Sequence, residues 1–325
     1  MRKKDKKSGL KTMKILSLFD GIACGRLAFE RAGIPVEKYY ASEIDKYAIQ
    51  VAQKNFPDII QIGDVTKLNF ADYKDVDIII GGSPCQDLSI AKQNREGLNG
   101  ERSRLFWDFI KALSVIKPKF FLLENVASMK DDDRDAITTV LRAIYPDTEC
   151  IMINSSLLSA QQRKRYYWTN WHNTQPEDRG IILGDIIEGA LADREKPRSV
   201  MSSIGRTTNR EFFKKHQGQL AFEPIRLGTL PNLGTGQANR IYSVKGKSVC
   251  LNALGGGGGA KTGLYKIDLP DGDYTIRKLT PIECERLQTL PDNYTAGISN
   301  TQRYKAIGNG WTVDVIAHLL KKLPL

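Results

Sequence analysis

The sequence predicts a doubly wound α/β fold, in which helices cover both faces of a mainly parallel sheet. Two observations support this prediction. Short, almost uninterrupted apolar runs alternate with segments of helical periodicity, and each run ends at a Gly, Asp or Glu residue. Strands that are buried on both faces of a parallel sheet are apolar in this way, and ligands bind beyond the carboxyl ends of such strands. We therefore expect a binding site where the apolar runs end.

Four apolar runs and four helical segments alternate in the first half of the chain. The predicted strands are 15–19, 39–42, 76–80 and 120–123, and the predicted helices are 26–32, 46–55, 105–116 and 134–144. Residues 172–276 lack this alternation and contain many Gly, Pro, Asn and Thr residues. Helical periodicity returns at 281–287 and 312–323. We expect a main domain of 13–171 plus 277–325 and a smaller, loop-rich domain of 172–276. The glycine run 255–259 fits both a flexible loop and a loop that lets backbone approach a ligand.

Positive charge is the unusual feature of an otherwise ordinary composition. The 325 residues include 48 Lys and Arg against 37 Asp and Glu, which gives a net charge of +11. The surplus is localised, because residues 1–14 carry +6 and residues 196–266 carry +10, whereas residues 15–195 carry −5. Basic segments of this kind favour a polyanionic partner. We expect the leader 1–12 to be disordered, and Met13 is an alternative natural start.

Cysteine and histidine usage argues against several classes of protein. The five cysteines form no Cys-x-x-Cys pair, and the three histidines are far apart. We therefore expect neither a disulfide framework nor a metal site. The apolar stretch 15–19 is too short for a signal-peptide core or a membrane span, so we expect a cytoplasmic protein with no membrane partner.

Three successive strand ends carry residues that are typical of a nucleoside site. The glycines of segment 19–25 allow a tight turn and a close backbone approach. Glu43 follows the next strand, where an acidic side chain can hold ribose hydroxyls, and Asp64 follows a third and can accept a hydrogen bond from adenine. Many α/β turns contain two glycines, so the first signal is weak alone. Together the three favour an adenosine-bearing cofactor.

Cys85 is the candidate nucleophile. An isolated cysteine is usually a small buried hydrophobe, but Cys85 follows a strand and a proline in Gly-Gly-Ser-Pro-Cys-Gln-Asp-Leu-Ser. This position exposes a thiolate at the carboxyl edge of the sheet, and the polar segment 87–104 after it suits a closing lid.

Two further segments carry charged groups suited to catalysis. Glu124 ends the apolar run 120–123, where a partly desolvated carboxyl can hold or share a proton; a capping or surface acid would look the same in sequence. Arg163 and Arg165 are two residues apart. On a strand they would share a face and bind a carbonyl oxygen or a phosphate, although a solvated charge run is the alternative.

The order of these segments resembles that of the DNA cytosine-C5 methyltransferases. The resemblance covers 13–171 and 277–325, and Pro-Cys-Gln, Glu-Asn-Val and Gln-x-Arg-x-Arg in this order are highly specific to that family. Its further motifs are 19–25, Glu43, Asp64, 277–289 and 308–310. Ser83, 104–107 and 309–313 are similar to the de novo methyltransferase branch of animals and its bacterial and phage relatives.

The resemblance implies a mechanism and a cofactor. A Rossmann-like domain would bind S-adenosylmethionine and transfer its methyl group to C5 of a cytosine that is flipped out of duplex DNA, at a cost of a few kcal/mol. Cys85 would add to C6 of the cytosine, Glu124 would bind N3 and N4, and Arg165, helped by Arg163, would hold O2.

The resemblance also implies further contacts and partners. The implied cofactor residues are Phe19, Asp20, Gly21, Ile22, Gly25, Glu43, Ile44, Asp64, Val65, Pro84, Leu105, Asn309, Gly310 and Trp311. The implied DNA contacts are Gln86, Ser89, Arg240, Lys245 and Lys247, the last three in the target-recognition region 172–276. Duplex DNA is the expected partner, in a bacterial or phage-infected cell and near the nucleoid. A cognate restriction endonuclease is a further partner that the resemblance allows, and we expect a monomer.

Three other interpretations compete with this one. The tRNA-methylating branch of the family shares the catalytic motifs, but its Cys-Phe-Thr segment is absent from this sequence. A catalytically dead DNA-binding relative would not need Cys85, Glu124 and both arginines. A Rossmann dehydrogenase has no use for a nucleophilic cysteine in hydride transfer.

Overall fold

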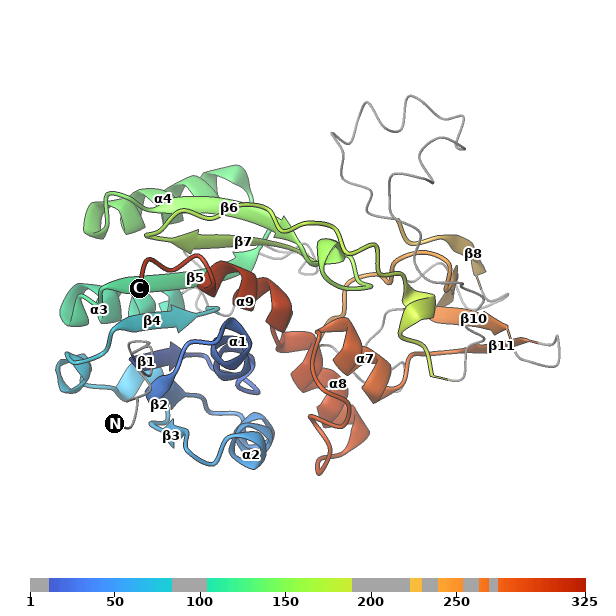
Figure 1. Ribbon diagram of the computed structural model, residues 1–325, viewed down its shortest axis with the longest axis horizontal. Coiled ribbons are helices and arrows are strands. Elements are labelled where there is room, and N and C mark those ends of the chain that lie inside the picture. Colours follow the sequence, from blue (N-terminus) through green and yellow to red (C-terminus); the bar gives the residue numbers. More distant parts are fainter. Residues whose placement is uncertain (1–11, 84–103, 189–222, 230–238, 254–262, 269–273) are drawn as a thin grey trace, which may run out of the picture. The chain divides into compact units, whose positions relative to one another are not determined.

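The computed structural model describes residues 12–83, 104–188, 223–229, 239–253, 263–268 and 274–325. The chain divides into two compact units. Unit 1 comprises Met1–Met152, Arg165–Thr174 and Ile316–Leu325, and unit 2 comprises Ile153–Lys164 and Gln175–Val315. Each unit contains its own sheet, as Figure 1 shows.

A seven-stranded sheet forms the centre of unit 1, in the order β3-β2-β1-β4-β5-β7-β6. The strands are β1 (Met13–Leu18), β2 (Val36–Ser42), β3 (Ile60–Gln61), β4 (Ile78–Gly81), β5 (Phe120–Val126), β6 (Glu149–Asn154) and β7 (Lys164–Thr169). β1 pairs in parallel with β2 and β4, and β4 pairs in parallel with β5. β7 runs antiparallel to β5. The parallel-rich sheet confirms the predicted fold class, and its topological switch point lies between β1 and β4.

The helices of unit 1 follow the strands in the expected places. They are α1 (Cys24–Ala32), α2 (Lys46–Asn55), α3 (Arg104–Ile116) and α4 (Asp131–Ile144), with the short 3₁₀ turns η1 (Val65–Lys67) and η2 (Phe70–Tyr73). Asp45 caps α2 by accepting hydrogen bonds from the amides of Tyr47 and Ala48. α1 ends at Gly33, which has the left-handed φ that favours glycine at this position.

Unit 1 has an apolar core, and the C-terminal residues of the chain also belong to this unit. Side chains from α3 and α4 pack with those of β1, β4 and β5, among them Leu16, Ile79, Phe109, Leu113, Phe121 and Leu141. The helix α9 (Val313–Leu320) returns the chain to this unit, where the indole nitrogen of Trp171 donates to the carbonyl of Leu319 at 3.1 Å. Figure 1 shows the C-terminus beside the sheet.

Unit 2 contains a four-stranded sheet in the order β11-β10-β9-β8. Its elements are β8 (Arg226–Thr229), β9 (Arg240–Ser243), β10 (Leu264–Asp268), β11 (Tyr274–Arg277), α7 (Pro281–Leu287), α8 (Asn300–Asn309), η5 (Ser155–Leu157) and η6 (Leu183–Asp185). A capping box of Thr280 and Glu283, with Pro281 in the first turn, begins α7. Tyr242, Tyr265 and residues of α7 and α8 form one apolar cluster.

The main differences from the sequence prediction lie in the short elements. β3, α8 and the four strands of unit 2 have too few apolar residues in sequence to stand out as buried elements. β6 is also absent from the prediction, although residues 150–153 are apolar. In the described parts of the chain, no helix combines the length and apolar character needed to cross a membrane.

Candidate active site

The loop between β1 and α1 has a strained backbone. Phe19, Gly21 and Ala23 have φ values of 60°, 62° and 61°. The left-handed conformation costs a residue other than glycine about 1–2 kcal/mol, and such strain is characteristic of functional sites. The amide of Gly21 donates to Oε2 of Glu43 at 2.8 Å, which ties this loop to the end of β2.

Asp20, within the same loop, is a buried carboxyl with incomplete hydrogen bonding. Its Oδ1 accepts a hydrogen bond from the Tyr39 hydroxyl at 2.7 Å. Its Oδ2 is buried and accepts none. Burial raises the pKa of Asp20 to about 6; hydroxyls of Ser17 and Tyr39 lower it, and the charge of Glu43 raises it further. A buried acceptor without a donor calls for an explanation in a native structure.

The ends of β2 and β3 present two more carboxylates and an apolar side chain. Oε1 of Glu43 accepts from the amides of Ile44 and Asp45 at 2.8 and 2.9 Å, which fixes the carboxylate. Ile44 is 75% exposed, unusual for a large apolar side chain. Asp64 caps η1 through the amide and hydroxyl of Thr66, and these hydrogen bonds lower the pKa of Asp64.

The other residues implied for the cofactor are divided between the units. Ile22, Gly25 and Val65 are buried near these strand ends, and Leu105 is partly buried on α3. Asn309, Gly310 and Trp311 belong to unit 2. Pro84, Cys85, Gln86 and Ser89 lie outside the described residues.

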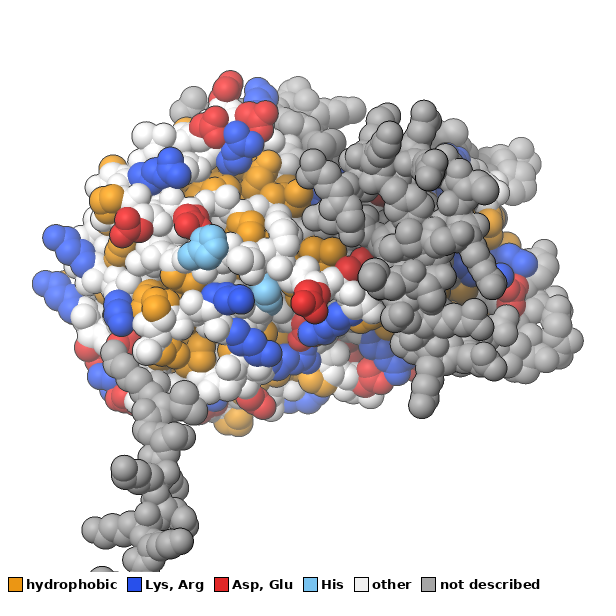
Figure 2. All heavy atoms as spheres, turned by 45° about the horizontal axis from the view of Figure 1, so that its top comes forward, with side chains coloured by type: hydrophobic (Ala, Val, Ile, Leu, Met, Phe, Trp, Pro, Cys, Tyr) orange, Lys and Arg blue, Asp and Glu red, His pale blue; other side chains and the backbone are white. Residues whose placement is uncertain are grey.

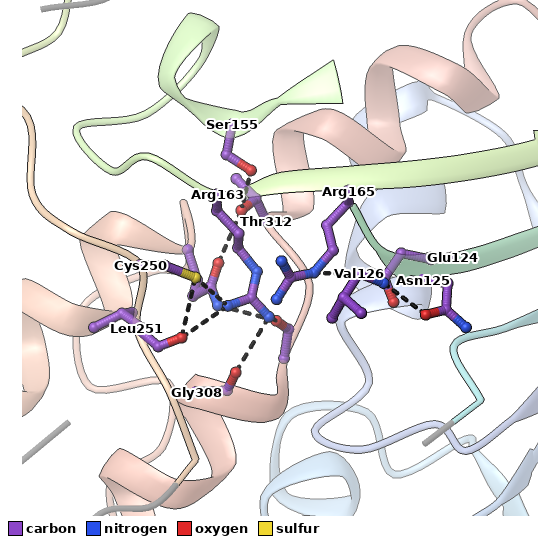
Figure 3. Close-up of polar contacts among 12 residues, drawn as sticks. Glu124, Asn125, Val126, Ser155, Arg163, Arg165, Cys250, Leu251, Gly308 and Thr312 are labelled. Carbon is purple, nitrogen blue, oxygen red and sulfur yellow. Dashed lines mark hydrogen bonds and ion pairs between the residues drawn. The ribbon is translucent and has the colours of Figure 1, made fainter. Parts of the chain in front are cut away.

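Glu124 and Arg165 form an ion pair in unit 1 (Figure 3). Nε of Arg165 lies 2.9 Å from Oε1 of Glu124, and the two side chains are 14% and 11% exposed. Glu124 lies near the carboxyl end of β5 and Arg165 near the start of the antiparallel β7, where it is paired with Val126. The register thus places a carboxylate and a guanidinium together beyond the apolar part of the sheet.

Arg163 has a different environment from Arg165, contrary to the expected shared face. It precedes β7 and is almost completely buried in unit 2. Its guanidinium donates to the carbonyls of Leu251 and Gly308 at 3.1 and 3.2 Å, as Figure 3 shows, and to the carbonyl of Gly310 at 3.0 Å. The guanidinium of Arg163 thus holds backbone carbonyls of unit 2, and its expected role in helping Arg165 to hold O2 stays a prediction.

One of the three expected DNA contacts in unit 2 is also corrected. Lys247 is completely buried, and its ammonium donates to the carbonyls of Ser156, Ser159 and Ile181. A side chain held in this way does not reach a phosphate. Lys245 is exposed and Arg240 is half-buried. On the face drawn in Figure 2, the described Lys and Arg side chains are interspersed with Asp and Glu side chains.

A family model for C-5 cytosine-specific DNA methylase matches residues 13–324. The type II methyltransferase M.HhaI of Haemophilus parahaemolyticus is 31% identical, over 97% of this chain and 95% of its own length. The chain belongs to the C-5 cytosine-specific DNA methylase family. It is accordingly a DNA cytosine-C5 methyltransferase that uses S-adenosylmethionine as methyl donor, as the sequence motifs predicted.

Two further relatives extend the comparison with this methylase. The type II methyltransferase M.NlaX of Neisseria lactamica is 30% identical, over 95% of this chain and 96% of its own length. The solved structure of the methyltransferase EhMeth of Entamoeba histolytica has a TM-score of 0.67 at 17% identity, and covers 96% of this chain and 98% of its own. That likeness supports the fold.

The strand ends of the methylase fit the methyl donor. Ile44 offers an exposed apolar side chain, Glu43 and Asp64 offer carboxylate acceptors, and Oδ2 of Asp20 has no hydrogen-bond donor. This combination suits a ligand with an apolar ring and with hydroxyl and amino groups. Sequence reasoning missed Tyr39, the hydroxyl partner of Asp20, because a tyrosine inside a strand carries no sign of its partner.

Two buried glutamines of unit 2 were also not predicted as functional. Gln161 donates to the carbonyl of Leu287 and to the side chain of Gln288, both at 2.9 Å. Gln288 in turn donates to the carbonyls of Ile307 and Gly310 at 2.9 Å. Together with Arg163 they fix the segment that ends α8. In sequence, the indication that these glutamines matter was their place in two segments that resemble family motifs, Gln-x-Arg-x-Arg and 277–289.

Proposed function

We propose that this methylase transfers the methyl group to C5 of a cytosine in duplex DNA through a covalent adduct with Cys85. The main support is the Glu124–Arg165 ion pair at the end of β5. Gly81 of β4 pairs with Leu123 of β5 in a parallel register. The carboxyl ends of parallel strands emerge at one edge of a sheet, so β4 ends at the edge where Glu124 lies, near the end of β5.

The chain supplies groups for the addition to C6, for the protonation of N3 and for holding O2. The Cys85 thiolate adds to C6 of cytosine, and Glu124 donates a proton to N3 while it holds the N4 amino group. Arg165 holds O2 through the N–H groups of its guanidinium. S-adenosylmethionine, when bound, supplies the methyl group to C5. A base then removes the C5 proton, the C5–C6 double bond re-forms, Cys85 leaves as a thiolate, and N3 returns its proton to Glu124.

The cofactor is held at the strand ends of unit 1 in this proposal. Ile44 and Phe19 pack on adenine, Asp64 accepts from its amino group, and Glu43 accepts from the ribose hydroxyls. The further proposed cofactor residues of unit 1 are Asp20, Gly21, Ile22, Gly25, Val65, Pro84 and Leu105. Asn309, Gly310 and Trp311 of unit 2 stay predicted cofactor residues from the sequence resemblance.

The target cytosine must leave the duplex, because C6 and C5 are not accessible to a nucleophile within the base stack. We propose that 13–171 with 277–325 perform catalysis and that 172–276 recognise the target sequence. Arg240, Lys245, Gln86 and Ser89 are the proposed DNA contacts. We place the enzyme in the cytoplasm near the nucleoid, as a monomer, either in a restriction-modification system with a cognate endonuclease or as a phage or solitary modifier.

Transfer of labelled methyl groups tests the substrate and the nucleophile together. The wild-type protein is incubated with labelled S-adenosylmethionine and either duplex DNA or tRNA, and Cys85→Ser and Cys150→Ser are compared with it. We expect labelled DNA from the wild type and from Cys150→Ser, and no label from Cys85→Ser. Label in tRNA alone would establish the RNA-methylating alternative, and full activity of Cys85→Ser would exclude the covalent route.

A further inference from the structure

We propose that the hydroxyls of Ser155 and Thr312 position the segment 309–311 for the methyl donor, acting through the side-chain amide of Gln288. The inference rests on the proposed function, because it takes residues 309–311 as cofactor residues on the sequence resemblance. It adds two positioning residues, and neither of them is expected to touch the cofactor itself.

The end of α8 is held by a buried side chain. The last carbonyl groups of a helix have no partner within that helix, and Gly310 leaves α8 with an extended backbone, at φ −65° and ψ 161°. The carbonyls of Ile307 and Gly310 both accept hydrogen bonds from Nε2 of Gln288 at 2.9 Å. Asn309, between these two residues, is exposed. The backbone on both sides of Asn309 is therefore fixed while its side chain stays accessible to a ligand.

The amide of Gln288 uses its full hydrogen-bonding capacity. Its two N–H groups go to the carbonyls of residues 307 and 310, so the amide oxygen points away from them. This oxygen, Oε1, accepts from Nε2 of Gln161 at 2.9 Å and from the hydroxyl of Thr312 at 2.8 Å. Gln288 is completely buried, and a buried polar network is rigid when every member is satisfied. The two donors to Oε1 thus set the orientation of the amide that holds both carbonyls.

The hydroxyl of Ser155 completes this chain of hydrogen bonds. It lies 2.8 Å from the hydroxyl of Thr312, as Figure 3 shows. Because Thr312 gives its only hydroxyl hydrogen to Gln288, Ser155 is the donor to Thr312. Both side chains are 1% exposed, and both belong to unit 2. The hydroxyl of Ser155 therefore reaches the end of α8 through Thr312.

Loss of the Thr312 hydroxyl loosens the segment without releasing it. The amide of Gln288 keeps Gln161 as one donor to Oε1, and the carbonyls of residues 308 and 310 keep their hydrogen bonds to Arg163. A ligand that contacts residues 309–311 then has to immobilise them, and this cost weakens its binding. The residues assigned to the chemical step are unchanged. We therefore expect a lower affinity for the cofactor with an unchanged kcat at saturating cofactor.

The experiment measures the affinity of the full-length protein for S-adenosylhomocysteine by calorimetry. Thr312→Val removes the hydroxyl and keeps the volume of the side chain, and we expect it to weaken binding about fivefold or more. Thr312→Ser keeps the hydroxyl and should bind within about twofold of the wild type. In methyl transfer, Thr312→Val should raise the KM for S-adenosylmethionine by a similar factor and leave kcat and the KM for DNA within about twofold.

A double substitution tests whether Ser155 acts through Thr312. Ser155→Ala should weaken binding of S-adenosylhomocysteine about threefold in the wild-type background. In the Thr312→Val background it should cause no further weakening, because its effect passes through a hydroxyl that is already absent. Losses of affinity that multiply independently would overturn the inference.

Thr169→Val is the matched control. Thr169 in β7 of unit 1 is also 1% exposed, and its hydroxyl likewise accepts from one side chain, Asn173 at 3.0 Å, and donates to one acceptor, the carbonyl of Trp171 at 2.8 Å. We expect Thr169→Val to lose as much stability in urea as Thr312→Val, and to keep the affinity of the wild type. Thermal unfolding checks that every variant is folded.

The outcomes are distinct for the inference and for the proposed function. Wild-type affinity in Thr312→Val, or an equal loss of affinity in Thr169→Val, would overturn the inference while leaving the cofactor site intact. Failure of the wild-type protein to bind S-adenosylhomocysteine would instead reject the cofactor site on which the inference rests.

Discussion

Arg163 holds three backbone carbonyls of unit 2, and this leads to a stability prediction. Arg163→Lys replaces a planar fork by a single ammonium, which cannot reach the carbonyls of Leu251, Gly308 and Gly310 together. Each buried carbonyl left without a donor costs about 1–3 kcal/mol. We expect the free energy of unfolding in urea to fall by about 2–4 kcal/mol.

Arg165→Lys is the matched control for that substitution. Its ammonium can still approach Glu124, so the free energy of unfolding should change by less than about 1 kcal/mol, whereas methyl transfer should fall at least tenfold because the guanidinium fork that holds O2 is absent. A larger loss of stability in Arg165→Lys than in Arg163→Lys would contradict the different roles assigned to the two arginines.

Lys247 gives a prediction about pH. Burial lowers the pKa of its ammonium to about 8, while the nearby Asp178 and Asp185 raise it. A lysine of the unfolded chain titrates near pH 10.4. Between about pH 8 and pH 10 the unfolded chain therefore binds more protons than the folded one, and the contribution of Lys247 to stability rises with pH.

The comparison with Lys247→Met isolates this contribution. The unfolding free energy of the wild type minus that of Lys247→Met should increase as the pH is raised from 8 to 10. Urea unfolding at each pH measures it. Lys245→Met, at an exposed position of the same turn, should show a pH-independent difference. A flat difference for Lys247→Met would mean that the ammonium stays charged, stabilised by its three carbonyl partners.

At the scale of elements, α8 packs against the segment after Leu251 through a glycine. A Cβ on Gly308 would lie 2.4 Å from the carbonyl oxygen of Asn252 and 2.8 Å from the amide nitrogen of Ala253. Alanine stabilises a helix by about 1 kcal/mol relative to glycine, but a clash with backbone forces the two segments apart. We expect Gly308→Ala to lower the free energy of unfolding by about 2 kcal/mol or more.

Gly184→Ala is the control for Gly308→Ala. It lies in η6, and an added Cβ would be 3.4 Å from the nearest atom, the carbonyl oxygen of Val244, which is an ordinary contact. Its unfolding free energy should stay within about 0.5 kcal/mol of the wild type. A stable Gly308→Ala protein would show that the close approach is not required for folding.

The elements that sequence predicted are those with an unambiguous apolar pattern. The runs at β1, β4 and β5 are buried on both sides of the sheet, so their residues are apolar without alternation, and the polar residues after them mark the site edge. Glu124 was predicted as a carboxyl at this edge and Arg165 as a charged residue of a separate strand, and their pairing needed the antiparallel register of β5 and β7.

The elements that sequence missed depend on contacts between distant segments. β8 and β9 are four residues each and include arginine, glycine and serine, so their own sequences predict strands only weakly. They form a sheet because they pair with each other. The burial of Lys247 depends on carbonyls of residues 156, 159 and 181, far away in sequence. A basic residue in a basic region looks like a DNA contact until those partners are known.

At the scale of the whole molecule, net charge is concentrated in one segment. Residues 196–266 contain twelve basic and two acidic residues, whereas residues 15–195 are net negative. The burial of Lys247 removes one of the twelve from contact with solvent. We expect basic residues among the other eleven to neutralise phosphates, which would make DNA binding depend on salt through the release of counterions.

Exchange of three lysines in that segment tests where DNA binds. Lys214→Gln, Lys215→Gln and Lys245→Gln combined should reduce the slope of log affinity against log salt by about 0.9 for each phosphate that is no longer neutralised, hence by up to about 2.7. The control combines Lys54→Gln, Lys74→Gln and Lys130→Gln, exposed residues with the same change in net charge. Its slope should match the wild type, because release of condensed counterions requires contact with the duplex and a distant charge contributes only a screened attraction. Equal slopes for both triple variants would place the DNA-binding surface outside 196–266.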